Sequence, residues 1–240
     1  MSVISKDTIH RLLKDVKQII KNPLTDNGIY YIHDDTDMLK GYALIIGPEN
    51  TPYFGGNYLF EISYPYDYPH SPPKVKYCTN GNKIRFNPNL YVCGKVCVSL
   101  LNTWSGEQWT SCQTISTILL TLCTLLCENP LLNEPGVNIH HTDIKNYNEI
   151  IEFSNLDIAI CDIIQKKQGV FMPFFNYFYP FIKENFYKNI NKLLEFAEKK
   201  LNDYRTPLEL KTGFYSLNVL IDYNKIINKL KKTQEYIENN

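Results

Sequence analysis

The residue best suited to carry chemistry in this sequence is a cysteine in a polar, turn-rich stretch. Cys97 lies within RFNPNLYVCGKVCVSLLNTW, and Gly94, three residues earlier, allows the backbone to double back. Loops held on a rigid scaffold often carry reactive groups, so a cysteine in this position is a candidate nucleophile. The alternative is a small buried thiol with only a packing role, and the loop alone does not decide between them.

The other cysteines and the histidines make a weaker case for a metal site. Cys93 lies in the same loop, but a C-x3-C pair without a second matched pair is poor zinc spacing. Cys123 and Cys127 are one turn apart in an apolar run, where core thiols are expected. His140 and His141 could be ligands or bases, although a surface turn is the simpler interpretation. We therefore predict that the chain binds no metal.

The charges are unevenly distributed along the chain. There are 25 basic and 25 acidic side chains, and a formal net charge of zero argues against a bulk nucleic-acid binder. Residues 1–21 hold five basic and two acidic side chains, residues 22–164 hold seven and fifteen, and residues 165–240 hold thirteen and eight, giving +3, −8 and +5. Such asymmetry is typical of distinct partner surfaces, although solvated faces would produce it too.

Nothing in the sequence indicates export or a membrane span. The first 21 residues carry charges every few positions and lack the apolar region of a signal peptide. The two most apolar stretches, residues 115–127 and 170–182, are much shorter than the roughly 20 residues that a bilayer helix needs. A globular protein with seven reduced cysteines is therefore expected in the cytoplasm or nucleus, or in the host-cell cytoplasm if the source is a virus.

The elements that must position Cys97 begin with an amphipathic helix and a set of short strands. Apolar residues recur at helical spacing from Lys6 to Lys21, with Ser5 as the N-cap, and the outer face carries Arg11, Lys14 and Lys17. Strands this close together leave no room for crossover helices, so they should form an antiparallel meander. The predicted strands are residues 29–33, 38–46, 57–64 and 74–78.

The rest of the chain is predicted to be helical. Residues 113–128 are apolar nearly all round and should form a buried helix, and residues 143–165 form an amphipathic one. Two more helices are expected at residues 183–203 and 217–238. The fold class is then α+β, with a core over residues 1–165 and a helical extension over residues 166–240 that packs on the core because its aromatic residues need cover.

Two motifs resemble the ubiquitin-conjugating enzyme family, and the resemblance covers residues 5 to about 140. The segment IIGPENTPYFGGNYLFEISYPYDYPHSPPKV matches the family signature over about thirty residues. Asn89 stands eight residues before Cys97, in Asn87-Pro88-Asn89, where the family has His-Pro-Asn before its cysteine. The segments RFNPNLY, GKVCVSLLNTW and ENPLLNEPG resemble the Z-type subgroup and the related domain of the giant BIR-repeat protein, and that subgroup also has Asn in place of His. The Z type further resembles this chain across residues 145–164.

The resemblance implies a fold, a reaction and a set of catalytic residues. The fold is the ubiquitin-conjugating one, and the reaction is acceptance of ubiquitin on Cys97 as a thioester, followed by transfer to a substrate lysine or a ligase. Asn89 would support the oxyanion or the active-site loop. Glu134 aligns with an acid at the gate for the acceptor lysine, with an ordinary loop carboxylate as the alternative. Ser99 occupies a position where the family often has another acid, and no cofactor or metal is implied.

The resemblance also implies partners and leaves two other functions open. Ubiquitin, its activating enzyme, ligases and protein substrates are the expected partners, with no nucleic acid and no membrane. Activating enzyme would dock on the first helix through Arg11, Lys14 and Lys17. Ligases would dock on the proline loop around Pro69 and His70 and on a second loop that follows Trp109. One alternative function is a weak variant that binds ubiquitin or acts as a scaffold. The other is a conjugating enzyme for another ubiquitin-like modifier.

Overall fold

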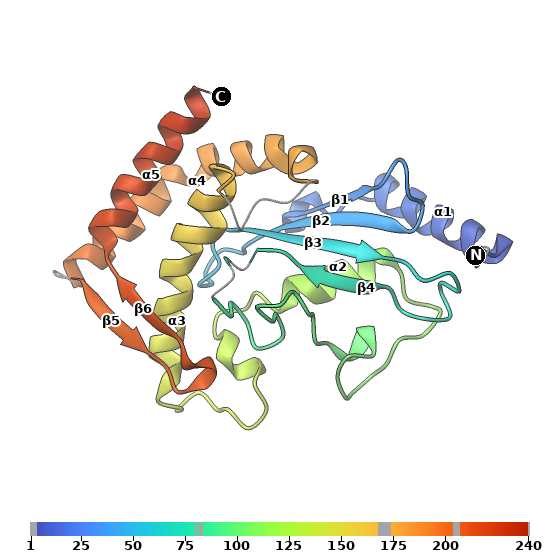
Figure 1. Cartoon of the computed structure of the whole chain (residues 1–240), viewed down its shortest axis with the longest axis horizontal. Helices are drawn as coiled ribbons and strands as arrows, with labels where there is room; N and C mark the ends of the chain where they lie inside the picture. The colour runs from blue at the N-terminus through green and yellow to red at the C-terminus, as the bar shows by residue number, and fades with distance from the viewer. Residues whose placement is uncertain (1–3, 80, 82–83, 168–173, 204–206, 240) are drawn as a thin grey trace.

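The computed structural model shows an elongated α+β molecule built around one four-stranded antiparallel sheet (Figure 1). The sheet has the order β1-β2-β3-β4, which confirms the predicted meander. Its strands are β1 (Ile29–His33), β2 (Lys40–Ile46), β3 (Asn57–Ser63) and β4 (Lys74–Tyr77). The structure describes residues 4–79, 81, 84–167, 174–203 and 207–239, so residues 170–173 of the apolar stretch at residues 170–182 lie outside it.

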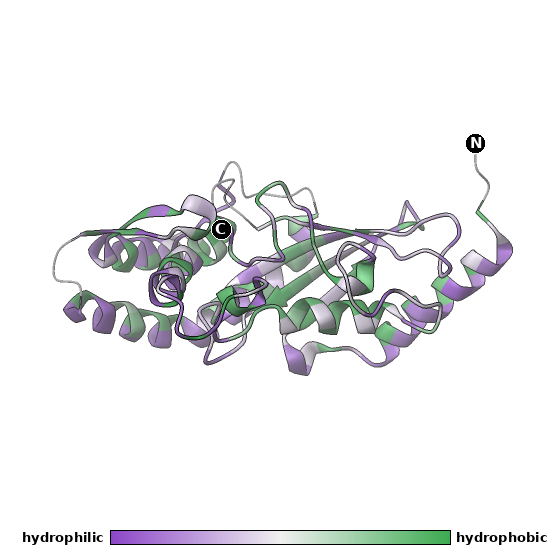
Figure 2. Ribbon diagram, turned by 90° about the horizontal axis from the view of Figure 1, so that it is seen from below, coloured by the Kyte–Doolittle hydropathy of each residue, from purple (hydrophilic) through white to green (hydrophobic). Residues whose placement is uncertain are grey.

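The two central strands bury side chains on both faces of the sheet. Ala43 pairs with Phe60 on one face, and Leu44 pairs with Leu59 on the other, and all four are fully buried. Because successive side chains of a strand point to opposite faces, an apolar run of this kind needs cover on both sides. In Figure 2 the central strands are mainly green, whereas the helices to their left alternate between green and purple turns.

One face of the sheet is covered by the first two helices, α1 (Lys6–Lys21) and α2 (Ile115–Thr124). The hydroxyl of Ser5 accepts a hydrogen bond of 3.0 Å from the N–H of Thr8, which caps α1 at the predicted residue. The second helix is shorter than the predicted 113–128, because the capping box of Thr114 starts it late and the chain leaves the helix after Thr124. The buried residues of the two helices and of this face of the sheet form one hydrophobic core.

The other face is covered by α4 (Phe175–Asp203) and α5 (Tyr223–Glu238), which belong to the C-terminal part. The ring of Tyr30 stacks on Phe181 with centroids 4.5 Å apart, and the ring of Tyr42 stacks on Phe174 at 4.4 Å. Contacts of this kind between aromatic rings add to the area that they bury. Figure 1 shows α4 and α5 at the end of the sheet opposite the N-terminus.

The prediction that the C-terminal part contains only helices is wrong. A two-stranded antiparallel hairpin, β5 (Leu208–Lys211) and β6 (Asn218–Ile221), lies between α4 and α5, beside α3 (Asp143–Ser154) (Figure 1). The apolar residues of β6 are followed directly by the helical pattern of α5. Periodicity alone therefore predicted one helix from Leu217 onward. The true start of α5 is set by Asp222, whose side chain accepts from the N–H of Lys225 at 3.2 Å.

The predicted helix at residues 143–165 is continuous but changes its winding. After α3 comes the π-helix η4 (Asn155–Asp162). The widened turn places Asn155 between two partners, because its Nδ2 donates to the carbonyl of Phe54 at 2.9 Å and its Oδ1 accepts from the hydroxyl of Tyr58 at 2.7 Å. A π-helical turn is rare, and no local sequence pattern predicts it.

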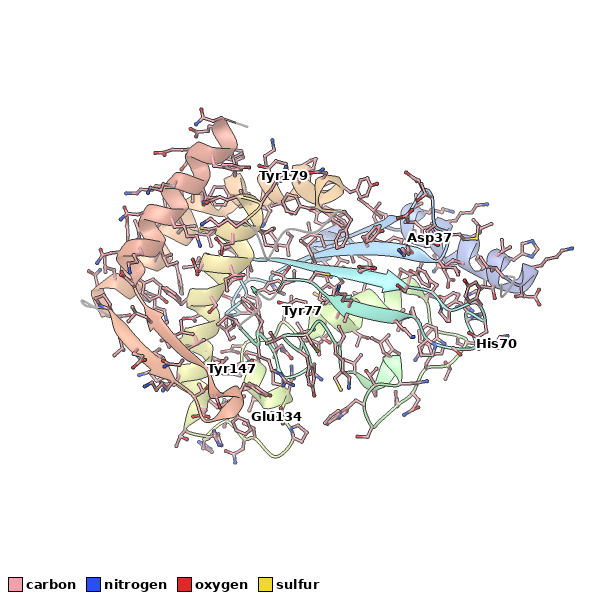
Figure 3. The ribbon with its side chains drawn as sticks, viewed as in Figure 1. Asp37, His70, Tyr77, Glu134, Tyr147 and Tyr179 are labelled. Carbon is pink, nitrogen blue, oxygen red and sulfur yellow. The ribbon has the colours of Figure 1, made fainter. Side chains whose placement is uncertain are left out.

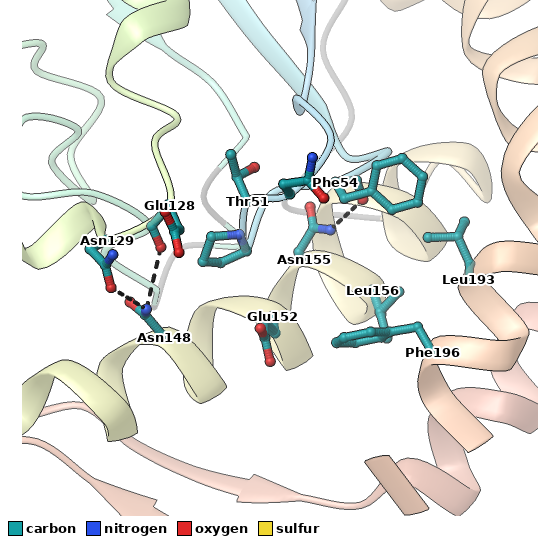
Figure 4. Close-up of a pocket in the computed structure, with 12 residues that line it drawn as sticks. Thr51, Phe54, Glu128, Asn129, Asn148, Glu152, Asn155, Leu156, Leu193 and Phe196 are labelled. Carbon is teal, nitrogen blue, oxygen red and sulfur yellow. Dashed lines mark hydrogen bonds between the residues drawn. The ribbon is translucent and has the colours of Figure 1, made fainter. Parts of the chain in front are cut away.

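A cavity of about 410 Å³ lies where α3 and η4 face α4 (Figure 4). It is lined by Phe54, Asn155, Leu193 and Phe196 among others, and none of the residues predicted to carry chemistry lines it.

Within the described ranges, no helix is both long and apolar enough to span a bilayer.

Docking of α4 should be a major source of stability. Phe186 is 1% exposed in the second core, and its neighbour Tyr187 is 46% exposed. We expect Phe186→Ala to lower the free energy of unfolding by about 3–5 kcal/mol, because it leaves a cavity in a packed core. Tyr187→Ala should change it by about 0.5 kcal/mol or less. Urea denaturation of the whole chain measures the free energy of unfolding of both variants. Equal losses would contradict the packing of Phe186 against the sheet.

Candidate active site

Cys97 sits in a tight loop stabilised by backbone hydrogen bonds. Its side chain is 3% exposed, its N–H donates to the carbonyl of Asn89 at 2.9 Å, and its Sγ donates to the carbonyl of Thr103 at 2.9 Å. The turn before it depends on Gly94, whose φ is +92° and where an added Cβ would lie 3.0 Å from the carbonyl of Tyr77. The predicted reversal of the backbone at this glycine is present.

The side chain of Asn89 is bound to the cysteine residue itself. Its Nδ2 donates to the backbone carbonyl of Cys97 at 2.6 Å. Among the described residues, its Oδ1 is buried without a hydrogen-bond partner. This hydrogen bond attaches the amide to the loop that carries Cys97.

Asn87, the departure from the family's histidine, has all the partners that a buried amide needs. Its Nδ2 donates to the carbonyl of Leu125 at 2.7 Å and to the hydroxyl of Tyr53 at 3.2 Å, and its Oδ1 accepts from the N–H of Asn89 at 2.9 Å. The side chain is fully buried. It therefore connects the end of α2 to the residue that supports the cysteine loop.

Thr103, which no sequence pattern indicated, closes the loop on its other side. The N–H of Val98 donates to the hydroxyl of Thr103 at 2.9 Å, and this hydroxyl lies 3.0 Å from the carbonyls of both Val96 and Val98. A threonine within a loop gives no sequence signal for such a role, because the contacts depend on how the chain folds back.

Cys97, Asn89 and Glu134 line one cavity of about 150 Å³. Glu134 follows the short 3-10 helix η3 (Pro130–Asn133), and its side chain is half-buried. Its Oε2 accepts a hydrogen bond from the hydroxyl of Tyr215, which also lines the cavity. Figure 3 shows Glu134 at the lower edge of the molecule, beside the tip of the β5-β6 hairpin. The sequence analysis gave no role to Tyr215.

A positive charge completes the wall of this cavity. The guanidinium of Arg85 lies between two rings, 3.7 Å from the centroid of Tyr91 and 4.2 Å from that of Tyr215. Its Nη2 donates to the carbonyl of Pro88 at 2.6 Å. Cation–π contacts on both faces hold the guanidinium in place. Cavity residues from three distant parts of the chain therefore meet at Cys97.

Arg11 does not lie free on the outer face of α1, contrary to the prediction. It pairs with the buried Asp15 at 3.0 Å and donates to the carbonyls of Ser111 and Gln113, each at 2.5 Å. These bonds attach α1 to the segment before α2. Lys14 and Lys17 are exposed, as predicted from the helical periodicity.

Trp109, which was expected at the ligase-binding surface, is itself buried. It is 8% exposed, and its Nε1 donates to the carbonyl of Pro69 at 2.7 Å. The side chain therefore holds in place the loop that contains Pro69. His70 is exposed and Pro69 is half-buried, and Figure 3 shows His70 toward the right-hand end of the molecule, well away from Glu134.

The remaining cysteines and histidines form no cluster with Cys97. Cys93 is exposed, whereas Cys123 and Cys127 are half-buried, and burial raises the pKa of both half-buried thiols. His141 packs against Phe214 with ring centroids 5.1 Å apart. The part of the chain that the structure describes holds no group of three His, Cys, Asp or Glu side chains that could bind a metal ion.

The meander and the cysteine loop together define a class of protein. The family model for the ubiquitin-conjugating enzyme matches residues 11–154, which is more than half of the chain. The chain therefore belongs to the ubiquitin-conjugating enzyme family. The predictions of family, fold class and enzyme class are confirmed, whereas the roles of the individual residues stay predictions.

Within the family, the chain is similar to proteins named ubiquitin-conjugating enzyme E2 Z. It is 37% identical to that of Xenopus tropicalis over 85% of this chain and 70% of the frog protein. It is 45% identical to that of Danio rerio over 68% of this chain and 50% of the relative, and 46% identical to that of Homo sapiens over 65% and 45%. The chain thus spans about half the length of the fish and human relatives.

The hydroxyl of Thr103 should be needed for the stability of the cysteine loop. Thr103→Val keeps the shape but leaves the buried N–H of Val98 without its acceptor, so we expect a loss of about 1–3 kcal/mol in the free energy of unfolding. Thr103→Ser, which keeps the hydroxyl, should lose less than half of that. Urea denaturation compares the two variants, and equal losses would mean that the methyl group matters instead.

Proposed function

We propose that Cys97 accepts ubiquitin from an activating enzyme as a thioester and passes it to a lysine or to a ligase. The observation that carries this proposal is the cavity in which Cys97 meets Asn89 and Glu134, inside the segment that matches the family model. The thiolate attacks the carbonyl carbon of the thioester on the activating enzyme, whose own thiolate leaves. An acceptor amine then attacks the new thioester, Cys97 leaves as a thiolate, and the amine loses a proton.

Asn89 is proposed to act through the loop. Its hydrogen bond to the carbonyl of Cys97 fixes the backbone of the residue whose Sγ carries the acyl group. A fixed loop keeps the thioester carbonyl in one orientation for attack, which lowers the entropic cost of the reaction. The same amide has a second N–H, which is proposed to stabilise negative charge on the thioester carbonyl oxygen.

Glu134 is proposed to attract and orient the acceptor lysine. It lines the same cavity as Cys97, and a carboxylate there favours the approach of an ammonium or amine group. Ser99, at the position where the family often has another acid, brings no charge. Among the described residues that line this cavity, Glu134 is the one carboxylate, and it is proposed to attract the amine by itself.

The proposed division of the chain follows from the two cores. Residues 1–165 are the catalytic core, and residues 166–240 are an extension that covers the outer face of the sheet. The proposed location is the cytoplasm or nucleus, which is consistent with seven cysteines that are all free thiols in the structure. Ligases are proposed to bind around Pro69 and His70.

Charging of the thiol tests the proposal directly. With activating enzyme, ATP and ubiquitin, the protein should form an adduct that thiol reagents reverse. Cys97→Ala should form none, and Cys97→Ser should form an oxygen ester that resists thiols. Cys93→Ala, an exposed cysteine of the same loop, is the matched control and should charge normally. Non-reducing gels read out all four proteins.

Several outcomes would change the assignment. An adduct that persists in Cys97→Ala would overturn it. Tight binding of ubiquitin without any thioester would favour a non-catalytic module, and charging with another modifier alone would change the cargo. Because the similarity to the Z type suggests a less common activating enzyme, each ubiquitin-activating enzyme is tested side by side.

Lys14 and Lys17 are proposed to guide the activating enzyme to α1. Reversing both charges, Lys14→Glu with Lys17→Glu, should slow charging roughly tenfold at low ionic strength, because long-range attraction raises association rates. The effect should shrink as salt is added. Lys231→Glu with Lys232→Glu makes the same change in net charge on exposed residues of α5 and should leave charging unchanged. If both pairs of substitutions slowed charging equally, the cause would be the net charge of the protein and not the position of the lysines on α1.

A further inference from the structure

The cavity at Cys97 contains one residue from the C-terminal part. Tyr215 lies in the 3-10 turn η5 (Phe214–Ser216), at the tip of the β5-β6 hairpin. The family model ends at residue 154, so this side chain comes from outside the matched segment. Its hydroxyl nevertheless donates to Glu134, and its ring covers Arg85.

The hairpin tip is anchored on α3 by several hydrogen bonds. The N–H of Phe214 donates to Asp143 at 2.9 Å, and the amide of Asn146 donates to the carbonyl of Lys211 at 3.0 Å. Within the tip, the hydroxyl of Thr212 donates to the carbonyl of Phe214 at 2.7 Å. These bonds make the tip a fixed part of the core.

The backbone of the tip adopts an unfavourable conformation to present the tyrosine. Tyr215 has a φ of +59° and Ser216 a φ of +49°, in the left-handed region that residues with a side chain rarely adopt. Such residues cost about 1–3 kcal/mol each and persist only where the surrounding structure fixes them. Here the anchored hairpin provides the fixed surroundings, and the result is a side chain directed at the wall of the cysteine cavity.

The tyrosine is held on its ring as well as at its hydroxyl. Its ring centroid lies 4.2 Å from the guanidinium of Arg85 and 6.1 Å from the ring of Tyr147, whose own hydroxyl donates to the carbonyl of Arg85 at 2.7 Å. Burial and the neighbouring carboxylate of Glu134 raise the pKa of the Tyr215 hydroxyl, so it remains a donor at neutral pH. The contact with Glu134 is therefore a hydrogen bond from a neutral phenol to a carboxylate.

We infer that Tyr215 is a positioning residue that orients the carboxylate of Glu134 toward the acceptor amine, so that the C-terminal hairpin completes the active site of the core. A glutamate at the end of a short 3-10 helix has several rotamers, and holding one of them removes an entropic cost from each turnover. A carboxylate accepts at two oxygens, so one bond from Tyr215 leaves capacity for an amine. This inference rests on the proposed function, because it requires a thioester at Cys97.

The step that the positioning affects is the transfer to lysine. The amine nitrogen bonds to the thioester carbonyl carbon, the carbon–sulfur bond breaks, Cys97 leaves as a thiolate, and the extra proton of the amine passes to solvent. Formation of the thioester uses the thiol of Cys97 and the activating enzyme, with no amine in the cavity. Loss of the Tyr215 hydroxyl should therefore affect discharge to lysine and leave charging unchanged.

The test uses Tyr215→Phe in the full chain, which keeps the ring over Arg85 and removes only the hydroxyl. Charging should proceed within twofold of the wild-type rate. Single-turnover discharge to free lysine should slow by about tenfold to a hundredfold, the range expected for one hydrogen bond to a charged group. Discharge to hydroxylamine, a small nucleophile that is uncharged at neutral pH and needs no carboxylate to orient it, should remain unchanged.

Two further variants make the test specific. Glu134→Gln should show the same selective loss, and the double variant should lose no more than either single one, because both changes remove the same interaction. Tyr187→Phe removes an exposed hydroxyl of α4 and should behave as wild type.

Each other outcome counts against the inference. Discharge of Tyr215→Phe to lysine at the wild-type rate would overturn it, and equal slowing with lysine and hydroxylamine would reduce Tyr215 to a structural role. If Tyr215→Phe does not fold, a Glu134→Gln variant without the selective loss would overturn it by itself. If the wild-type chain forms no thioester at all, the proposed function fails instead, and the two failures are thus distinguishable.

Discussion

Burial of the central strands on both faces of the sheet is the constraint on which the rest of the structure depends. Ala43 and Phe60 need cover from α1 and α2, while Leu44 and Leu59 need it from the opposite side. The aromatic face of α4 supplies that second cover, so the C-terminal part cannot be independent of the core. Once α4 and α5 are fixed, the hairpin between them is carried to α3 and its tip to the cysteine cavity.

The active-site loop is shaped by neutral hydrogen bonds. Asn87, Asn89 and Thr103 each connect backbone groups that helices and strands leave unpaired, and together they hold Cys97 from both sides. Unpaired buried groups of this kind would cost stability, so the amides and the hydroxyl are required by the irregular path of the chain. Among the described residues that line the cavity, the charged side chains are Glu134 and Arg85.

Much of the fold could be predicted, and the failures have physical causes. Four short strands, α1 with its cap and the cysteine loop follow from periodicity, turn residues and the family motifs. The hairpin was missed because a short strand followed by an amphipathic helix forms one continuous apolar pattern, which periodicity cannot divide. Arg11 and Trp109 were expected at a surface, but hydrogen bonds to distant carbonyl groups draw both side chains inward.

The sequence by itself determined the family, the α+β meander and the cysteine that carries the proposed chemistry, because these depend on residue types at short and fixed spacings. The tertiary structure alone decided which residues surround that cysteine. Thr103 and Tyr215 reach the site through loop closure and through the docking of a distant hairpin, and no local pattern encodes either contact. Long-range packing, driven by the need to cover both faces of one sheet, brings them there.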